Sequence, residues 1–140
     1  MKKITTTTEF IPQKNRNWSL IDVKDQVLGR ILPEISSRLQ GKHRVDYSAN
    51  LDVGDNVIVI NAAQVAITGK KAKTKIYTRY SGYPGGLRQM TFAQMKEKKP
   101  EEIIKTGVSG MLPKNKLRAK RLARLFVFKD DKHPYQDKLA

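Results

Sequence analysis

The feature that most constrains the fold is an unbroken run of β-branched residues, Val57-Ile58-Val59-Ile60, in the middle of the chain. Turn-forming residues bound this run on both sides, at 54–56 and at Asn61. An apolar run of this length without polar alternation predicts a strand that is buried on both faces. The chain has 140 residues, of which 39% are hydrophobic, so it can form the core of one domain around that strand.

Periodicity predicts two elements before this strand. Aromatic and β-branched residues alternate loosely over residues 18–23, which predicts another strand. Leu28, Ile31, Leu32, Ile35 and Leu39 recur at helical spacing and predict a helix over 28–40 that ends at Gly41. Pro33 conflicts with that helix, so it lies either in a late first turn or at a kink.

Shorter patterns predict the remaining elements. Thr91 can cap a helix, Pro100 suits the first residue of the next one, and Gly107 and Gly110 interrupt that second pattern. Helices that alternate with short apolar strands predict a compact α/β domain with a mainly parallel sheet. The further strands are expected at 65–68, 76–80 and 125–128, and the further helices at 91–99, 100–106 and 114–124.

The chain divides into three regions by composition. Residues 1–15 are polar and threonine-rich and predict an irregular N-terminal arm, residues 16–129 predict one domain, and residues 130–140 predict a polar tail. We find no internal repeat, no low-complexity segment and no linker that would split the domain.

The charge balance points to a polyanionic partner. Lys and Arg number 28 against 13 Asp and Glu, which gives a net charge of +15. Cations at this density repel one another in a compact protein unless an anion neutralises them. A highly charged surface that serves solubility alone is the simpler alternative, but this excess is larger than solubility needs.

The first basic cluster runs along residues 70–88 and lies among tyrosines. No acidic residue occurs between Asn56 and Lys96. Tyr80 and Tyr83 either stack on unpaired bases or are simply exposed, while alternation places Tyr77 in the core. The cations of this cluster, which we expect to contact RNA phosphates, are Lys70, Lys71, Lys73, Lys75, Arg79 and Arg88.

A glycine turn at 81–86 interrupts the first basic cluster. Pro-Gly is a common turn signal, so an ordinary tight turn is the simplest interpretation. The position between Arg79 and Arg88 also favours a loop in which Gly85 and Gly86 let a phosphodiester backbone approach main-chain N–H groups.

The second basic cluster lies near the C-terminus. No acidic residue lies between Ile103 and Lys129, so these cations have no local ion-pair partners, unlike those of an ordinary solvated helix. We therefore expect a helix that follows phosphates. Its cations are Lys114, Lys116, Arg118, Lys120, Arg121 and Arg124.

Catalytic, metal and membrane functions find little support. The chain has no cysteine and two histidines, His43 and His133, so it predicts no metal site and no cofactor. The Asp pairs at 52 and 55 and at 130 and 131 lie in turn-like sequence. Neither a secretory signal nor an apolar run near the roughly 20 residues of a membrane helix is present. The residues predict a soluble intracellular protein that is not an enzyme.

Several motifs together resemble the universal large-subunit ribosomal protein thirteen family in its bacterial form. The resemblance covers residues 16–134 and depends on the joint order and spacing of short motifs. These motifs are Leu28-Gly29-Arg30, Gly41-Lys42-His43, Asp52-Val53-Gly54-Asp55, Thr68-Gly69-Lys70, the glycine turn at 81–86, VSGMLPK at 108–114, and LFVF at 125–128.

The resemblance implies a three-layer α/β/α domain around a four-stranded, mainly parallel sheet. It implies a structural constituent of the large ribosomal subunit that binds its RNA, contacts neighbouring ribosomal proteins and helps early assembly of the subunit. It places the protein on cytoplasmic ribosomes. It also implies that Lys42, His43 and Arg44 face RNA together with the two basic clusters.

Two other functions stay open. The chain could regulate as an RNA-binding protein outside the ribosome, for which the sequence offers no sign. It could also be an enzyme that holds a nucleotide phosphate with the Thr68-Gly69-Lys70-Lys71 segment, although the first glycine of a phosphate loop is missing. Saturable binding of a mononucleotide would favour the enzyme.

Overall fold

A computed structural model of the protein describes residues 16–139, and the predicted arm at 1–15 lies outside them. A three-stranded parallel sheet forms the centre, in the order β1-β2-β5. Its strands are β1 (Trp18–Asp22), β2 (Asn56–Ile60) and β5 (Leu125–Val127). The apolar run supplies β2, whose residues from Val57 to Ile60 are all buried, as predicted.

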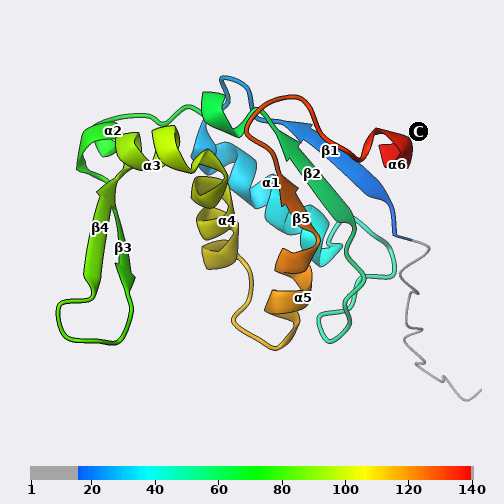
Figure 1. The fold of residues 1–140 in the computed structure, drawn as a ribbon. Coiled ribbons are helices and arrows are strands. Elements are labelled where there is room, and N and C mark those ends of the chain that lie inside the picture. The colour runs from blue at the N-terminus through cyan, green and yellow to red at the C-terminus, as the bar shows by residue number, and fades with distance from the viewer. Residues whose placement is uncertain (1–15, 140) are drawn as a thin grey trace, which may run out of the picture.

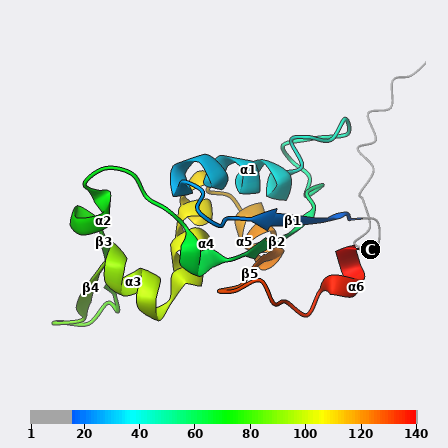
Figure 2. The ribbon, with the colours of Figure 1, turned by 90° about the horizontal axis from the view of Figure 1, so that it is seen from above.

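Two helices cover one face of this sheet. The predicted helix is α1 (Leu28–Gln40), and its apolar stripe packs with α4 (Pro100–Met111) against Val57 and Val59. Pro33 lies within α1 on its exposed side and does not interrupt it. Gly41 ends the helix in the left-handed conformation, with φ of +78°, which glycine adopts without steric cost. Figure 2 shows α1 on one side of the sheet.

The C-terminal segment covers the opposite face. Trp18 stacks on Phe126 at 5.6 Å and on Tyr135 at 5.3 Å between ring centroids, so the tail is attached to β1 and β5. The tail ends in the four-residue helix α6 (Gln136–Leu139), which lies near β1 on the side of the sheet away from α1 (Figures 1 and 2).

The expected four-stranded sheet is wrong. The residues predicted as a strand at 65–68 form only one bridge, between Ala66 and Val27. The chain bends in the 3-10 helix η2 (Ala62–Gln64) just before this segment and turns again at Gly69, where φ is +73°. The parallel sheet of the described residues therefore has three strands.

A separate two-stranded hairpin stands away from the sheet. It consists of β3 (Ile76–Tyr80), which matches the predicted extended segment, and β4 (Leu87–Thr91), which the sequence did not predict. The short helices α2 (Lys71–Thr74) and α3 (Phe92–Lys98) flank its base (Figure 1). Thr91 caps α3 as predicted and forms a reciprocal capping box with Gln94.

Two expected helices have other bounds. The helix expected at 100–106 continues to Met111 because Gly107 serves packing and does not end it: a Cβ there would lie 2.6 Å from Leu32 Cδ1. The helix expected at 114–124 is α5 (Leu117–Ala123), which leads directly into β5. The strand expected at 125–128 is β5.

Candidate nucleic-acid interface

The lysines of the first basic cluster lie on and beside α2. Lys70, Lys71 and Lys73 are exposed, and none of them forms an ion pair with another described residue. Lys75 is half-buried, with Nζ 5.2 Å from the centroid of the Tyr77 ring. These three exposed ammonium groups, on and beside a short helix, therefore form one positively charged surface.

The hairpin carries the other side chains of this cluster. Arg79 lies directly opposite Arg88 in the β3–β4 register, and both are exposed. Tyr80 and Tyr83 are 64% and 75% exposed, whereas Tyr77 packs against the core as predicted. The tip thus presents aromatic rings beside cations, which is the combination that single-stranded nucleic acids need.

The two glycines singled out at the hairpin tip differ in their surroundings. Gly85 is exposed and has φ of +72°, in the left-handed region that favours glycine. Gly86 is half-buried, and a Cβ there would lie 2.9 Å from the main-chain carbonyl oxygen of Tyr83, as well as 2.1 Å from Ser81 Oγ. Gly86 is therefore required by the turn itself, while the surface of Gly85 is open to a ligand.

The basic loop after α1 is partly tied to the protein. Lys42 is exposed, but His43 Nε2 lies 2.8 Å from Asp55 Oδ2, and Asp55 is buried. Arg44 reaches Asp55 Oδ1 at 3.3 Å and Asp46 Oδ1 at 3.1 Å. Asp55, expected only as a turn aspartate, therefore holds the loop in place and neutralises part of its charge.

The second basic cluster separates into two sets of side chains. Lys114, Lys116 and Lys120 are exposed, and Arg118 is half-buried with a hydrogen bond to Ser109 Oγ. The remaining two are interior residues: Arg121 is 1% exposed and Arg124 is 9% exposed. The prediction that all six cations face phosphates is therefore wrong for Arg121 and Arg124, because folding buries these two side chains.

Arg121 and Arg124 belong to a buried arginine cluster, which we define as these two residues with Arg16 and Asp52. Arg124 Nη2 donates to Asp52 Oδ1 at 2.7 Å and to the Leu39 carbonyl at 2.9 Å. Arg16 Nη2 donates to the Asp52 carbonyl at 3.0 Å, and Arg121 Nε lies 3.8 Å from Asp52 Oδ1. One carboxylate thus links three guanidinium groups from the start and the end of the domain.

The cluster holds more positive than negative charge. Burial alone would raise the pKa of Asp52, but the hydrogen bond and charge of Arg124, with the charge of Arg16, outweigh burial and hold that pKa below 3.8. Burial, and then the neighbouring Arg124, lower the pKa of Arg16. The Nε groups of the three arginines have no hydrogen-bond partner among the described residues. Removing Asp52 would leave three cations facing one another.

Sequence reasoning missed Arg16 and the role of Asp52. Arg124 and Asp52 are 72 residues apart in the chain, so no local pattern joins them. Asp52 lies in turn-like sequence, where an aspartate usually needs no distant partner. The absence of acids near the second basic cluster indicated unpaired cations, whereas the partner comes from another part of the fold.

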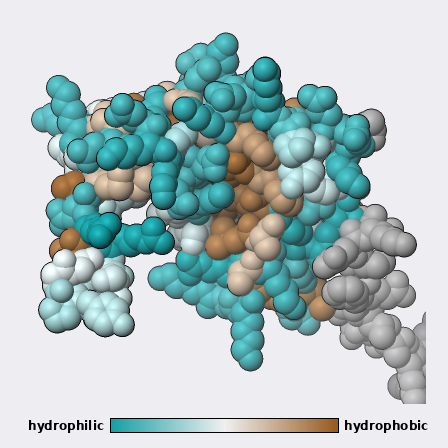
Figure 3. Space-filling view, in the orientation of Figure 1, coloured by the Kyte–Doolittle hydropathy of each residue, from teal (hydrophilic) through white to brown (hydrophobic). Residues whose placement is uncertain are grey.

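The surface shows where hydrophilic and hydrophobic side chains lie on one face of the molecule (Figure 3). In Figure 3 hydrophilic side chains cover most of the visible face, and hydrophobic side chains show in a hollow between α4 and β5. The hairpin forms a separate projection whose tip is intermediate in hydropathy, and an open gap separates it from the rest of the molecule (Figure 3).

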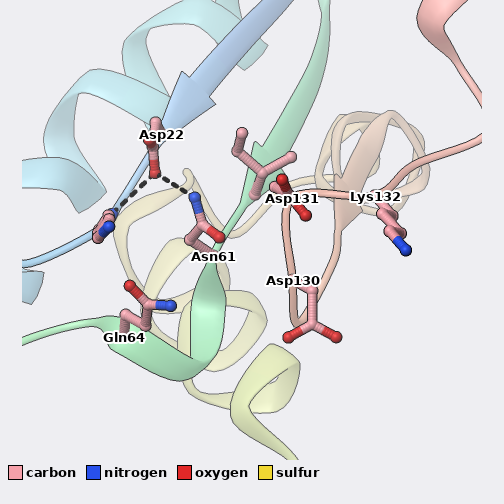
Figure 4. A pocket seen from close by; sticks show the side chains of 8 residues that line it. Asp22, Asn61, Gln64, Asp130, Asp131 and Lys132 are labelled. Atoms are coloured by element: carbon pink, nitrogen blue, oxygen red, sulfur yellow. Dashed lines mark hydrogen bonds between the residues drawn. The ribbon is translucent and has the colours of Figure 1, made fainter.

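A pocket of about 750 Å³ lies at the carboxyl ends of the parallel strands, where many α/β enzymes bind their ligands. Figure 4 shows Asp22, Asn61, Asp130 and Asp131 around it, with Asn61 donating to Asp22 at 2.8 Å. Its lining holds no histidine and more carboxylates than lysines, so it does not suit a nucleotide phosphate. The Thr68-Gly69-Lys70-Lys71 segment is not part of it.

Residues 16–139 contain no group of three or more His, Asp or Glu side chains that could hold a metal ion. They also contain no helix that is long and apolar enough to cross a membrane.

Comparison with known proteins gives consistent matches. The family model for ribosomal protein L13 matches residues 16–134. The large ribosomal subunit protein uL13 of Syntrophotalea carbinolica is 51% identical over 120 residues, which cover 86% of this chain and 84% of that protein. The uL13 protein of Hahella chejuensis is 42% identical over 135 residues, 96% of this chain and 93% of that protein. That of Staphylococcus carnosus is 44% identical over 120 residues, 86% and 83% of the two chains. The matched family segment takes in both basic clusters and the buried arginine cluster.

Proposed function

Because this chain belongs to the ribosomal protein L13 family, we propose that it binds large-subunit ribosomal RNA through three groups of exposed cations. It is a structural constituent of the large ribosomal subunit, not an enzyme, and it works on cytoplasmic ribosomes beside neighbouring ribosomal proteins. Its role in assembly follows from the same activity, because a folded basic domain can hold RNA segments together that otherwise repel each other.

The observation that carries the proposal is the set of unpaired, exposed cations on and around α2 and the hairpin. Lys70, Lys71 and Lys73 have no carboxylate partner among the described residues, and Arg79 and Arg88 have none either. A phosphate backbone supplies the missing charge, and the release of its counterions favours binding. Tyr80 and Tyr83 then offer stacking surfaces for unpaired bases.

The other two groups lie at the loop after α1 and at α5. In the loop, Lys42 faces RNA. His43 and Arg44 also face RNA from the outer side of the loop, while their ion pairs with Asp55 hold the loop in shape. At α5, Lys114, Lys116, Arg118 and Lys120 face RNA. Arg121 and Arg124 contribute to RNA binding only by holding this helix on the domain.

Residues 16–129 form the folded RNA-binding domain in this proposal, and residues 130–140 act as a tail. The stacking of Tyr135 on Trp18 supports a tail that packs on the face of the sheet opposite α1 and α4. A truncation after Lys129 tests this division: we expect the shortened protein to remain folded and to bind RNA. Loss of the circular dichroism signal of the folded domain would instead make the tail part of the domain.

A salt titration of RNA binding tests the proposed function. If about eight phosphates are contacted, the logarithm of the binding constant falls against the logarithm of salt concentration with a slope near −6 to −7. The probe is a transcript of large-subunit ribosomal RNA, measured by filter binding. A slope near −1, or a protein that stays at the top of a sucrose gradient and not with the large subunit, would contradict the proposal.

A matched pair of triple variants locates the surface. Changing Lys70, Lys71 and Lys73 to Gln should make the slope shallower by about 2, because three phosphate contacts are lost. The control changes three exposed lysines near the pocket at the strand ends, Lys24, Lys129 and Lys132, to Gln and removes the same charge. If both triples changed the slope equally, only net charge would matter and the assigned surface would be wrong.

A further inference from the structure

The register of the hairpin brings two arginines face to face. In the β3–β4 pairing, Arg79 is opposite Arg88, and directly opposed residues of an antiparallel pair project from the same face, with Cα atoms roughly 4.5–5.5 Å apart. Like charges in this position destabilise a sheet. The hairpin packs on the domain at its base through Tyr77, and an anion held between the two exposed arginines would remove their repulsion.

No described side chain provides that compensation. Neither arginine forms an ion pair or a side-chain hydrogen bond with residues 16–139, and the sequence has no acidic residue between Asn56 and Lys96. Elsewhere in the described domain, arginines that lie close together share a carboxylate, as Arg16 and Arg124 share Asp52. The hairpin pair is exposed, and residues 16–139 supply no anion for it to share.

The two faces of the hairpin differ in chemistry. One face carries the uncharged pairs Tyr80–Leu87, Thr78–Gln89 and Ile76–Thr91. The other carries Arg79 and Arg88 and, nearer the base, Tyr77 and Met90. Because Tyr77 packs against the core, the arginine face is the one that continues from the side attached to the domain.

We propose that Arg79 and Arg88 together bind one phosphate group of the RNA backbone, in a clamp formed across the two strands. This inference rests on the proposed function and names the ligand of one part of that surface. Arginine presents a planar fork that matches phosphate oxygens, and two forks from neighbouring strands can reach the same group. A phosphate between them replaces the repulsion of the pair with two attractive contacts and orders the hairpin on the RNA.

Single and double variants test the shared phosphate. We expect Arg79→Gln and Arg88→Gln each to weaken binding of the ribosomal RNA transcript about tenfold or more, as the loss of a charge-assisted hydrogen bond does. The double variant should lose little beyond either single, because one phosphate needs both arginines. Lys129→Gln, which also removes one exposed positive charge, is the control and should change binding about twofold.

Charge reversal separates binding from folding. Arg88→Glu places a carboxylate opposite Arg79, so the hairpin gains an attractive cross-strand pair while it loses the clamp. We expect RNA binding to fall at least as far as in Arg88→Gln, with no decrease in the thermal midpoint. If both the thermal midpoint and RNA binding decreased, Arg88 would support the fold and the clamp would be wrong.

The outcomes distinguish this inference from the proposed function. If the wild-type protein binds with a steep salt slope but the two arginine variants behave like Lys129→Gln, the clamp is wrong and the RNA-binding function stands. Losses that add fully in the double variant would show two separate contacts and would also overturn the shared phosphate. If the wild-type protein shows no steep salt slope, the proposed function fails and the clamp fails with it.

Discussion

The same side chain has opposite roles in two regions of this protein. Arg124 is buried and shares Asp52 with Arg16 and Arg121, whereas Arg88 is exposed opposite Arg79 without a carboxylate. In the buried arginine cluster the protein supplies the anion, so the charge serves the fold. In the hairpin the described part of the chain supplies none, so the charge is available to a partner. A count of cations along the chain does not separate these roles.

The largest expected effect comes from removing the shared anion of the buried arginine cluster. Asp52→Asn should lower the free energy of unfolding by about 3–5 kcal/mol, because buried guanidinium groups then lack their counter-charge. Urea denaturation measures this change. The control is Asp46→Asn, which removes an exposed carboxylate whose ion pair within residues 16–139 is with Arg44, and it should leave stability unchanged. Equal effects of the two variants would mean that the cluster does not stabilise the fold.

A smaller effect is expected from removing one of the three arginines. Arg124→Ala loses hydrogen bonds to Asp52 and to the Leu39 carbonyl, which should lower the free energy of unfolding by about 2–3 kcal/mol. Lys120→Ala, on the exposed side of the same helix, should leave stability unchanged and weaken RNA binding instead. Urea denaturation and filter binding of both variants test whether Arg124→Ala lowers stability while Lys120→Ala weakens RNA binding. If Lys120→Ala unfolded the domain, the division of this helix into two sides would be wrong.

Acid should weaken the buried arginine cluster gradually. The pKa of Asp52 in the folded protein lies below 3.8, its ordinary value. Its stabilising contribution is therefore fully present above that value and is lost as the pH falls through the lower, folded-state pKa. The stability difference between wild type and Asp52→Asn should shrink as the pH is lowered below about 4, as measured by denaturation at a series of pH values. A difference that stayed constant down to the acid transition would contradict the assignment.

The smallest expected effect lies where the hairpin joins the domain. The hydroxyl of Tyr77 is buried without a hydrogen-bond partner among the described residues, and burial raises the pKa of this side chain. Tyr77→Phe keeps the ring and removes the unpaired group, so it should stabilise the protein by up to about 1 kcal/mol. Thermal denaturation checks this. A marked loss of stability would mean that the hydroxyl has a partner, and that the hairpin base is more polar than its packing indicates.

Local patterns in the sequence predicted the elements that have a strong period or a clear cap. The apolar run at 57–60, the stripe of α1 and the cap at Thr91 each depend on residues within a few positions of one another. Where a residue can occur for more than one physical reason, the predicted ends of the helix were wrong. Gly107 has the appearance of a helix end, but it is there because Leu32 packs closely against it.

The sequence by itself determined the α/β class, the central strand, the positive charge and the family of this protein, because composition, period and motif order are properties of the chain. Only the tertiary structure decided which cations are free. Asp52 meets Arg124 because β2 and β5 are neighbours in the sheet, and Arg79 meets Arg88 because a hairpin sets their register. Whether a charged side chain forms a structural ion pair or stays free to bind a partner depends on which groups lie within a few ångströms of it. Folding decides this, because it brings together residues such as Asp52 and Arg124, which are 72 positions apart in the chain.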